Sequence, residues 1–400
     1  MAVAGVLPVL LGGDANVYGM ARSFYEAYGV HSVAVCKKTL PALAHSRLVQ
    51  AAVQNPRLEE DEVFTAALQA LAGAYPDKTC LLVSCADGYT MQLARCRKKL
   101  APLCRFACPP PEVVQSLGTK EGFAAVCAAN GLRTPQSVTL ACGAPLPDLP
   151  FGWPVIVKPA DSPVYWNCRF PGKRKVYLVQ DRTELEQTVA TVAQGGYTGA
   201  LLLQEYIPGP DTALGVVNAY CARDGSVSWM VQGQVLLQER TPEGVGNYGA
   251  ILTEPARQDT ALLASLAGLL RQSGWHGFAN FDFKYAPDGA PVLFEMNPRQ
   301  GRASYACTAA GANLALPLVE DLVQEQPVTL PGLHPAVWHT APWPLVRRRC
   351  PDKNLLRRAE ELRRNGCGCR HLLARGEGPA RWMWYWVRQG AYGRKTRQER

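Results

Sequence analysis

Short apolar runs alternate with amphipathic stretches along the first hundred residues. Residues 5–13 form an apolar run that ends in a glycine pair, and Met20, Phe24 and Ala27 recur at helical spacing within residues 14–28. A strand, a glycine turn and a helix in succession indicate an α/β unit with a buried parallel sheet. The alternation continues with strands predicted at 31–36 and 79–84, and with helices predicted at 66–74 and 89–100.

The glycine turn before the first helix has two interpretations. Free N–H groups at a helix start attract anions, which favours a ligand site. The alternative is a tight turn that only packs, because the G-x-G-x-x-G dinucleotide pattern is absent. A proline run near residue 110 indicates a boundary, so residues 1–112 are predicted as a first domain.

Beyond this boundary, apolar runs separated by polar turns predict a mainly antiparallel sheet with covering helices. We expect a second domain at 113–203, a third at 204–330 and a C-terminal extension at 331–400. Strands are predicted at 153–158, 176–179, 201–207, 212–221 and 226–232, and helices at 184–195, 258–274 and 303–325.

One predicted hairpin carries the clearest candidate chemistry. The runs 278–285 and 291–297 are rich in aromatic and branched residues and flank an Asp-Gly turn. Because alternate side chains of a strand share a face, Glu295 and Asn297 point the same way, and pairing across the hairpin brings Asp282 to them. Hard oxygen ligands of this kind suit a Mg²⁺ ion that also holds nucleotide phosphates. The alternative is an acidic hairpin that faces solvent.

Basic residues occupy positions where they could meet phosphate. Arg299 follows the hairpin in a polar loop and offers a planar fork for phosphate or carboxylate. Lys158 closes an apolar strand, and Lys120 lies near a predicted helix start, where a solvated surface lysine is the alternative. The loop 160–175 ends in the basic cluster Lys173, Arg174 and Lys175, which we interpret as a lid near phosphate or as a solvated turn.

Composition and charge narrow the class of protein. The chain has 400 residues, 48% hydrophobic and 19% charged, which is typical of a globular protein with two or three domains. Its first residues lack a secretory signal pattern, and no run of apolar residues is long enough to span a membrane. The 14 cysteines show no regular spacing, so reduced thiols in a cytoplasmic protein are expected.

The net charge of +9 comes from the C-terminal end. Residues 347–400 hold sixteen Lys and Arg against five acids, so the rest of the chain is close to neutral and does not indicate a nucleic-acid partner. Tryptophans are interspersed with these arginines, which suits a membrane surface or a phosphate-bearing precursor, or else a helical appendage packed on the rest of the protein. The trio Cys367, Cys369 and His371 is a weak zinc candidate, since a fourth ligand is missing.

The acidic hairpin and the two lysines together resemble the ATP-grasp ligases. The spacing of Asp282 from Glu295-x-Asn297 is similar to the hairpin that binds Mg²⁺ in that superfamily, and Lys120 and Lys158 match its phosphate-contacting lysines. The resemblance implies a mixed α/β and α+β ATP-grasp fold with an N-terminal parallel-sheet domain and a basic C-terminal extension. It also implies an adenine and ribose site at residues Gln204, Glu205, Tyr206, Ile207 and Asp211, with Lys175 near the phosphates.

The likeness extends to one family within the superfamily. The segments 10–29, 246–248, 278–285 and 295–302 look like those of the bacterial D-aspartate ligases. Those enzymes use ATP to activate the β-carboxylate of D-aspartate and join it to the lysine amine of the UDP-linked peptidoglycan pentapeptide. The resemblance implies ATP and Mg²⁺ or Mn²⁺ as cofactors, and these two small molecules as partners.

The same resemblance suggests roles for individual residues. The expected catalytic residues are Arg299, Arg302 and Lys158. Arg299 would steady the transferring phosphoryl group or the tetrahedral oxyanion, and Lys158 would hold the phosphates. Hypothetical anchors for the amino acid are Asp14, Arg22, Arg302 and Ser304. A soluble dipeptide ligase and a non-catalytic nucleotide-binding protein remain the alternative functions, and the sequence does not specify stereochemistry, acceptor or oligomeric state.

Overall fold

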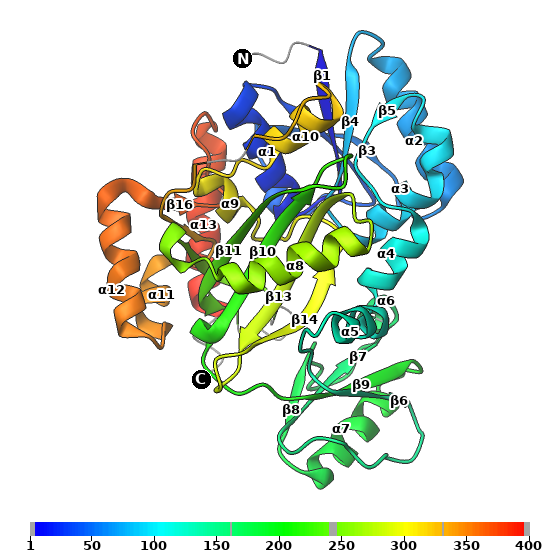
Figure 1. The fold of residues 1–400 in the computed structure, drawn as a ribbon, viewed down its shortest axis with the longest axis vertical. Coiled ribbons are helices and arrows are strands. Elements are labelled where there is room, and N and C mark those ends of the chain that lie inside the picture. Colours follow the sequence, from blue (N-terminus) through cyan, green and yellow to red (C-terminus); the bar gives the residue numbers. More distant parts are fainter. Residues whose placement is uncertain (1–4, 161, 240–245, 330–331, 396–400) are drawn as a thin grey trace.

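The computed structural model describes the chain except for residues 1–4, 161, 240–245, 330–331 and 396–400. Three β-sheets organise the described residues. Figure 1 shows the N-terminal sheet at the top, the large sheet in the middle and the small sheet at the bottom.

The N-terminal sheet has five parallel strands in the order β3-β2-β1-β4-β5. Its central strand β1 (Val6–Leu11) is buried along its whole length, as its unbroken apolar sequence requires. Helix α1 (Ala15–Tyr28) begins after Asp14, whose side chain caps it by accepting a hydrogen bond from the Asn16 N–H. The other elements are β2 (Ser32–Cys36), β3 (Val49–Gln54), β4 (Thr79–Ser84), β5 (Cys104–Arg105), α2 (Asp61–Ala74), α3 (Asp87–Leu100) and the single turn η1 (Pro41–Leu43).

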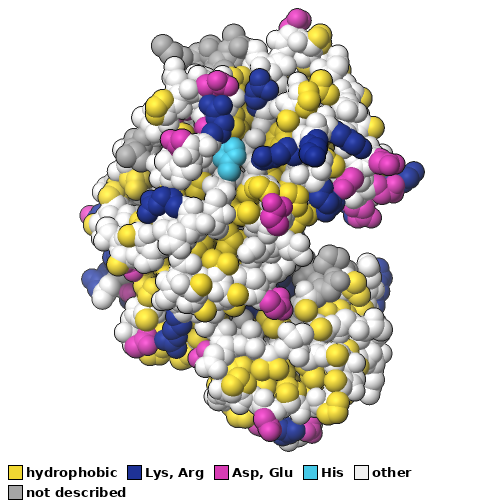
Figure 2. Space-filling view, turned by 45° about the vertical axis from the view of Figure 1, so that its right-hand side comes forward, with side chains coloured by type: hydrophobic (Ala, Val, Ile, Leu, Met, Phe, Trp, Pro, Cys, Tyr) yellow, Lys and Arg dark blue, Asp and Glu magenta, His cyan; other side chains and the backbone are white. Residues whose placement is uncertain are grey.

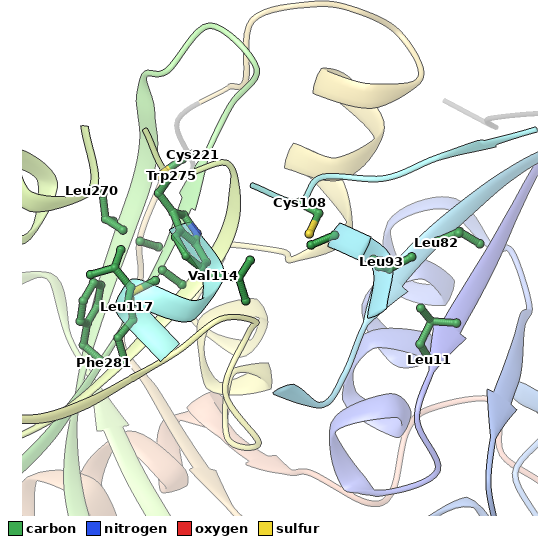
Figure 3. Close-up of a cluster of buried hydrophobic side chains, with 14 of the residues drawn as sticks. Leu11, Leu82, Leu93, Cys108, Val114, Leu117, Cys221, Leu270, Trp275 and Phe281 are labelled. Carbon is green, nitrogen blue, oxygen red and sulfur yellow. The ribbon is translucent and has the colours of Figure 1, made fainter. Parts of the chain in front are cut away.

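Two short helices, α4 (Pro111–Gly118) and α5 (Lys120–Ala129), lead from this sheet toward the other two. Figure 3 shows the apolar cluster around α4, with Leu93 on the N-terminal side, Val114 on the helix and Phe281 on the large sheet. A single buried core therefore joins the N-terminal sheet to the large sheet. The domain boundary near residue 112 stays a prediction, because this core crosses it.

The small sheet is antiparallel and has the order β6-β9-β7-β8. Its apolar face packs under helix α7 (Arg182–Gln194), as the cluster containing Leu185, Val192 and Leu203 shows. In Figure 2 this lobe projects below the rest of the molecule and is set off from it by a deep notch. The other elements are β6 (Ser137–Ala141), β7 (Val155–Pro159), β8 (Tyr177–Val179), β9 (Ala200–Glu205) and α6 (Ser162–Asn167).

The large sheet has seven strands in the order β14-β13-β10-β11-β12-β15-β16. All its pairs are antiparallel except the last. Helix α8 (Thr260–Gln272) lies across it in Figure 1 and buries Leu266 and Leu269 in the shared core. The strands are β10 (Leu214–Cys221), β11 (Val227–Gln238), β12 (Tyr248–Thr253), β13 (Gly277–Tyr285), β14 (Pro291–Asn297), β15 (Ala336–His339) and β16 (Gly368–Arg370), with the single turns η2 (Asp211–Ala213) and η3 (Pro255–Arg257).

The segment predicted as a C-terminal extension is built into this sheet. Strand β15 pairs with β12, and β16 pairs with β15, so residues 336–370 complete one edge. The buried side chains of Val337, Val346 and Leu355 form a core with Leu252 of β12. The helical elements here are α11 (Trp343–Arg349), α12 (Lys353–Leu362), the π-helical turn η4 (Arg363–Cys367) and α13 (Pro379–Lys395).

The single helix predicted at 303–325 is interrupted. It forms α9 (Tyr305–Ala309) and α10 (Ala315–Leu322), with Gly311 between them at φ 97°. A Cβ at Gly311 would lie 2.6 Å from the Gly332 carbonyl oxygen, so the break also brings the backbone close to that segment. Helical periodicity in the sequence does not reveal this close approach.

The cysteines are reduced, as the sequence predicts. All fourteen cysteines are free thiols, and most of them are buried. The weak zinc candidate is not supported, because the His371 ring lies within hydrogen-bond distance of the Ala15 carbonyl oxygen (2.9 Å) and no cluster of three metal-binding side chains occurs in the described residues. None of the helices in the described ranges is both long and apolar enough to cross a membrane.

Candidate active site

A cavity of about 760 Å³ lies between the small sheet and the large sheet. Strands β7 and β9 contribute one side, and β13, β14 and the loop after β14 contribute the other. Most of the site residues predicted from the sequence line this cavity. They are Lys120, Lys158, Lys175, Gln204, Glu205, Tyr206, Ile207, Asp211, Asp282, Glu295, Asn297, Arg299 and Arg302.

The acidic hairpin lies along the wall formed by β13 and β14. Their antiparallel register places Asp282 opposite Glu295 and Asn280 opposite Asn297. The Asn297 amide donates hydrogen bonds to Asp282 Oδ2 at 3.2 Å and to Asn280 Oδ1 at 3.0 Å. The Tyr248 hydroxyl donates to Asp282 Oδ1 at 2.8 Å. The hairpin therefore brings the three predicted side chains to one place.

The electrostatics of this acid pair fit a divalent cation. Burial and the neighbouring charge of Glu295 raise the pKa of Asp282 to about 7. Two adjacent, partly buried carboxylates repel each other unless a cation compensates them. Two carboxylates and the Asn297 amide offer hard oxygen ligands but fall short of the roughly six that Mg²⁺ takes. Since no cluster of three acidic, His or Cys side chains occurs among the described residues, nucleotide phosphates and water would supply the rest.

Three lysines line the same cavity. Lys158 on β7 donates a hydrogen bond to Gln204 Oε1 at 2.9 Å, and Lys120 is the first residue of α5. Burial and the charge of Lys120 lower the pKa of Lys158 to about 8. Burial lowers the pKa of Lys120, and the charge of Lys175 lowers it further while Glu295 opposes the shift. Cations held this close together favour a polyanion such as a triphosphate.

The basic residues of the loop predicted as a lid do not all face the cavity. Lys175 lines the cavity. Lys173 Nζ donates to the Cys168 carbonyl oxygen at 2.7 Å and lies 4.8 Å from the centroid of the Tyr165 ring, so it faces its own loop. The Tyr165 hydroxyl also donates to the Arg174 carbonyl oxygen at 2.6 Å, which fixes the turn back into β8.

We expect ATP to bind more weakly as the pH rises through about 8. The Lys158 pKa is lowered to about 8 in the free protein, and bound phosphates favour the charged ammonium. The interaction between the Lys158 ammonium and the ATP phosphates is therefore fully present below about pH 8. Above this pH the affinity for ATP falls by up to about tenfold per pH unit. Calorimetric titration between about pH 7 and about pH 9 measures it. A Lys158→Arg variant stays charged and should show a flatter profile; an equally steep one would assign the titration to another group.

The predicted adenine segment lies where β9 ends. Gln204 is engaged with Lys158, while the Glu205 carboxylate accepts a hydrogen bond from the Gln136 N–H at 3.1 Å. The Lys284 ammonium donates to the Ile207 carbonyl oxygen at 2.9 Å and so fixes the backbone that leads to β10.

Tyr206 and Asp211 complete this part of the wall. The Lys284 ammonium lies 5.6 Å from the centroid of the Tyr206 ring, and Asp211 Oδ2 accepts a hydrogen bond from the Gln238 N–H at 3.1 Å. Strands β11 and β13 of the large sheet thus position the segment predicted for the nucleoside. Residues 240–245 lie outside the described residues, although Gln238 and Glu239 beside them line the cavity.

The loop after β14 holds Arg299 at the cavity. Its guanidinium donates to Asn297 Oδ1 at 3.0 Å and lies 3.0 Å from Asp87 Oδ1 of the N-terminal sheet domain. The Asn16 side chain donates to the Gln300 carbonyl oxygen at 3.0 Å, so the start of α1 supports the loop from the same side. The N-terminal domain therefore positions the arginine rather than only covering the large sheet.

Arg302 lies further along this loop. A Cβ on Gly301 would lie 2.6 Å from the Asn280 amide nitrogen, so glycine is required for the loop to lie directly on β13. The Gly301 N–H donates to Asn218 Oδ1 at 3.1 Å. The Arg302 side chain is half exposed to the cavity, with Nε 4.0 Å from the Asp14 carboxylate. Asp14 itself caps α1 and does not line the cavity.

Two predicted substrate anchors lie away from the cavity, which corrects the expectation. Arg22 is buried: it pairs with Glu26 at 2.7 Å, donates to the Arg370 carbonyl oxygen at 2.7 Å and stacks on the Tyr305 ring. Ser304 is also buried and does not line the cavity. Arg22 joins α1 to the C-terminal segment because a buried guanidinium needs carbonyl and carboxylate partners. Its sequence position gave no sign of that role.

Comparison with known proteins identifies the family. Over 332 residues the chain is 36% identical to the D-aspartate ligase of Enterococcus faecium, a match that covers 80% of this chain and 77% of that protein. This chain belongs to the D-aspartate ligase family. A D-alanine–D-alanine ligase of an Anaeromyxobacter species is 26% identical over 176 residues, covering 43% of this chain and 53% of that protein. No family model matches the chain.

Solved structures confirm the ATP-grasp fold of this D-aspartate ligase homologue. An L-amino acid ligase from Bacillus licheniformis superposes with a TM-score of 0.57 at 17% identity, covering 79% of this chain and 74% of that one. An ADP complex of N5-carboxyaminoimidazole ribonucleotide synthetase gives a TM-score of 0.58 at 12% identity, covering 83% and 81%. The protein is an enzyme of the ATP-grasp class that forms C–N bonds, and the predicted α/β and α+β fold is confirmed.

Sequence analysis missed several residues of this family member's cavity. Tyr248 holds Asp282, and its only signal was its place in the segment 246–248 that resembles the family. Six further wall residues come from the C-terminal segment. They are Trp338, Thr340, Leu372, Arg388, Gln389 and Tyr392. No local pattern places them at the same site as the predicted phosphate-contacting lysines, which lie much earlier in the sequence.

Proposed function

We propose that this protein joins the β-carboxylate of D-aspartate to the lysine side-chain amine of the UDP-linked peptidoglycan pentapeptide, using ATP. The relative named D-aspartate ligase supports the donor, and the resemblance of segments 10–29 and 295–302 supports the family's acceptor. The observation that carries the proposal is one cavity in which the partly buried pair Asp282 and Glu295 is accompanied by Lys120 and Lys158.

Activation of the carboxylate comes first, because a carboxylate is a poor electrophile. A carboxylate oxygen attacks the γ-phosphorus of ATP, the bond to the β-phosphate oxygen breaks, and an acyl phosphate and ADP form. Lys120 and Lys158 hold the phosphates, and Arg299 steadies the transferring group. The acidic hairpin would hold Mg²⁺ or Mn²⁺, which would supply positive charge to neutralise the phosphates.

Amide formation completes the reaction. The amine attacks the acyl carbon, the C–N bond forms, the bond to phosphate breaks, and the amine proton passes to solvent. Arg299 lines the cavity, where its guanidinium stabilises the tetrahedral oxyanion. No step requires an enzyme nucleophile. ATP and the UDP-linked acceptor place the reaction in the cytoplasm.

The test measures ADP release with D-aspartate and the UDP-linked pentapeptide as substrates. We expect release that depends on both, and a product whose mass equals their condensation. D-aspartate with free amino acids as acceptors should give much slower release. Fast release with free amino acids would assign the protein to soluble dipeptide synthesis instead. ATP binding without acid-dependent ADP formation would make it a nucleotide-binding protein.

Contact with the membrane surface is a finer part of this proposal. One face of α13 exposes Trp382 (44%), Met383 (69%), Trp386 (53%) and Val387 (65%), and the Arg370 guanidinium lies 5.5 Å from the centroid of the Trp386 ring. Tryptophan with basic neighbours suits the headgroup region of an anionic bilayer. We expect sedimentation with anionic phosphatidylglycerol vesicles but not with neutral phosphatidylcholine vesicles. A Trp382→Ser, Trp386→Ser variant should remain in the supernatant; equal sedimentation of the variant would contradict the proposal.

A further inference from the structure

The C-terminal helix α13 takes part in the wall of the active-site cavity. Tyr385 on one face is buried in the core formed with α1 and the large sheet. Arg388, Gln389 and Tyr392 follow Tyr385 at helical spacing on the same side of the helix, and they line the cavity. The helix therefore presents an arginine to a cavity whose acidic hairpin and lysines come from much earlier in the sequence.

Arg388 lies close to two other charged groups of the wall. Arg302 comes from the loop after β14, and Glu239 comes from the end of β11. Burial raises the pKa of Glu239, and the charges of Arg302 and Arg388 oppose this rise. Burial lowers the pKa of Arg388, and the nearby charge of Arg302 lowers it further. Two guanidinium groups that repel each other across a solvent-accessible cavity are a site for an anion.

We propose that Arg302, Arg388 and Glu239 bind the amino-acid end of a dicarboxylic donor, the arginines holding its α-carboxylate and Glu239 its α-ammonium. This inference rests on the proposed function and deepens it. It makes the C-terminal segment a determinant of donor specificity, a role that neither its composition nor its basic charge indicated.

The chemistry of the donor explains why such a subsite is needed. Aspartate carries two carboxylates, and either could attack ATP. Anchoring the α-carboxylate and α-ammonium on this side of the cavity leaves the side-chain carboxylate to face Arg299 and the acidic hairpin. A cation pair and a carboxylate match the zwitterionic head of an amino acid, whereas the phosphates are matched by Lys120 and Lys158.

Truncated donors separate the roles of these groups. β-Alanine is aspartate without its α-carboxylate, and succinate is aspartate without its α-amine. We expect Arg388→Gln to lower kcat/KM for D-aspartate by about 10²-fold through a raised KM, and to collapse the preference for D-aspartate over β-alanine. Glu239→Gln should collapse the preference for D-aspartate over succinate. ADP release is the readout for both, and the KM for ATP should not move in either variant.

Arg394→Gln is the matched control, because Arg394 lies on the same helix and does not line the cavity. Its kinetics should equal those of the unaltered enzyme. An Arg388→Gln enzyme whose KM for D-aspartate stays within about twofold, or which loses D-aspartate and β-alanine activity equally, would overturn the inference. If the unaltered enzyme forms no ADP with D-aspartate, the proposed function is wrong, and the inference of a donor subsite is wrong as well.

Discussion

Replacing Glu295 by Gln should abolish ligase activity while leaving the metal-free protein at least as stable. Glu295 lies opposite Asp282 and helps to raise the pKa of Asp282 to about 7. The two carboxylates therefore repel each other in the absence of a cation. The isosteric amide removes that repulsion but also removes one ligand of Mg²⁺. We expect kcat to fall by about 10²–10³-fold or more. The melting temperature without Mg²⁺ at pH 8 should rise by about 1–3 °C.

The two readouts together distinguish a metal-binding role from a structural one. Steady-state ADP release measures activity, and thermal unfolding with and without Mg²⁺ and an ATP analogue measures stability. The stabilisation that Mg²⁺ and nucleotide give the unaltered protein should disappear in the variant. Glu254→Gln is an informative contrast, because Glu254 is buried but paired with Arg257 and Arg358. That variant should lose stability and keep the Mg²⁺ response; an unchanged Mg²⁺ response in Glu295→Gln would contradict our account.

Replacing Arg299 by Ala should lower kcat by about 10²–10³-fold with a smaller change in the KM for ATP. The guanidinium is held by Asn297 and Asp87 at 3.0 Å each, so it points at the site before any ligand binds. A preorganised charge of this kind acts on the transferring phosphoryl group rather than on ground-state binding. Arg299→Lys should recover only part of the rate, since an ammonium lacks the planar fork. Stopped assays of ADP formation at saturating ATP measure these rates.

The control for this prediction is Arg133→Ala. Arg133 is also partly exposed and paired, with Asp288 at 3.0 Å, but it does not line the cavity. Its loss should leave kcat unchanged to within about twofold. A raised KM for ATP at normal kcat in Arg299→Ala would show that the arginine only binds the nucleotide.

Local rules were enough to predict the acidic hairpin and the convergence of its side chains. The period of two in β-strands put Glu295 and Asn297 on one face, and the Asp-Gly turn set the pairing that brings Asp282 across. The lysines on β7 and α5 were found because the family resemblance named them. These signals share one property: each is carried by residues close together in the sequence.

The errors and omissions come from contacts between distant parts of the chain. The Arg22 side chain donates to the Arg370 carbonyl oxygen instead of reaching the cavity. Gly311 interrupts a helix because its backbone packs closely on Gly332. Arg388 reaches the site because residues 336–370 complete the large sheet and α13 folds back over it. Side-chain direction and long-range packing decide these positions, and a short stretch of sequence determines neither of them.

The most direct test of the central claim uses D-aspartate labelled with heavy oxygen in its β-carboxylate. When the amine attacks an acyl phosphate formed at that carboxylate, one carboxylate oxygen leaves with the released phosphate. We predict that the inorganic phosphate released with the UDP-linked pentapeptide carries one heavy oxygen, seen by mass spectrometry, and that label in the α-carboxylate never reaches it. Unlabelled phosphate from the β-labelled substrate would contradict the ligase mechanism that we assign to this cavity.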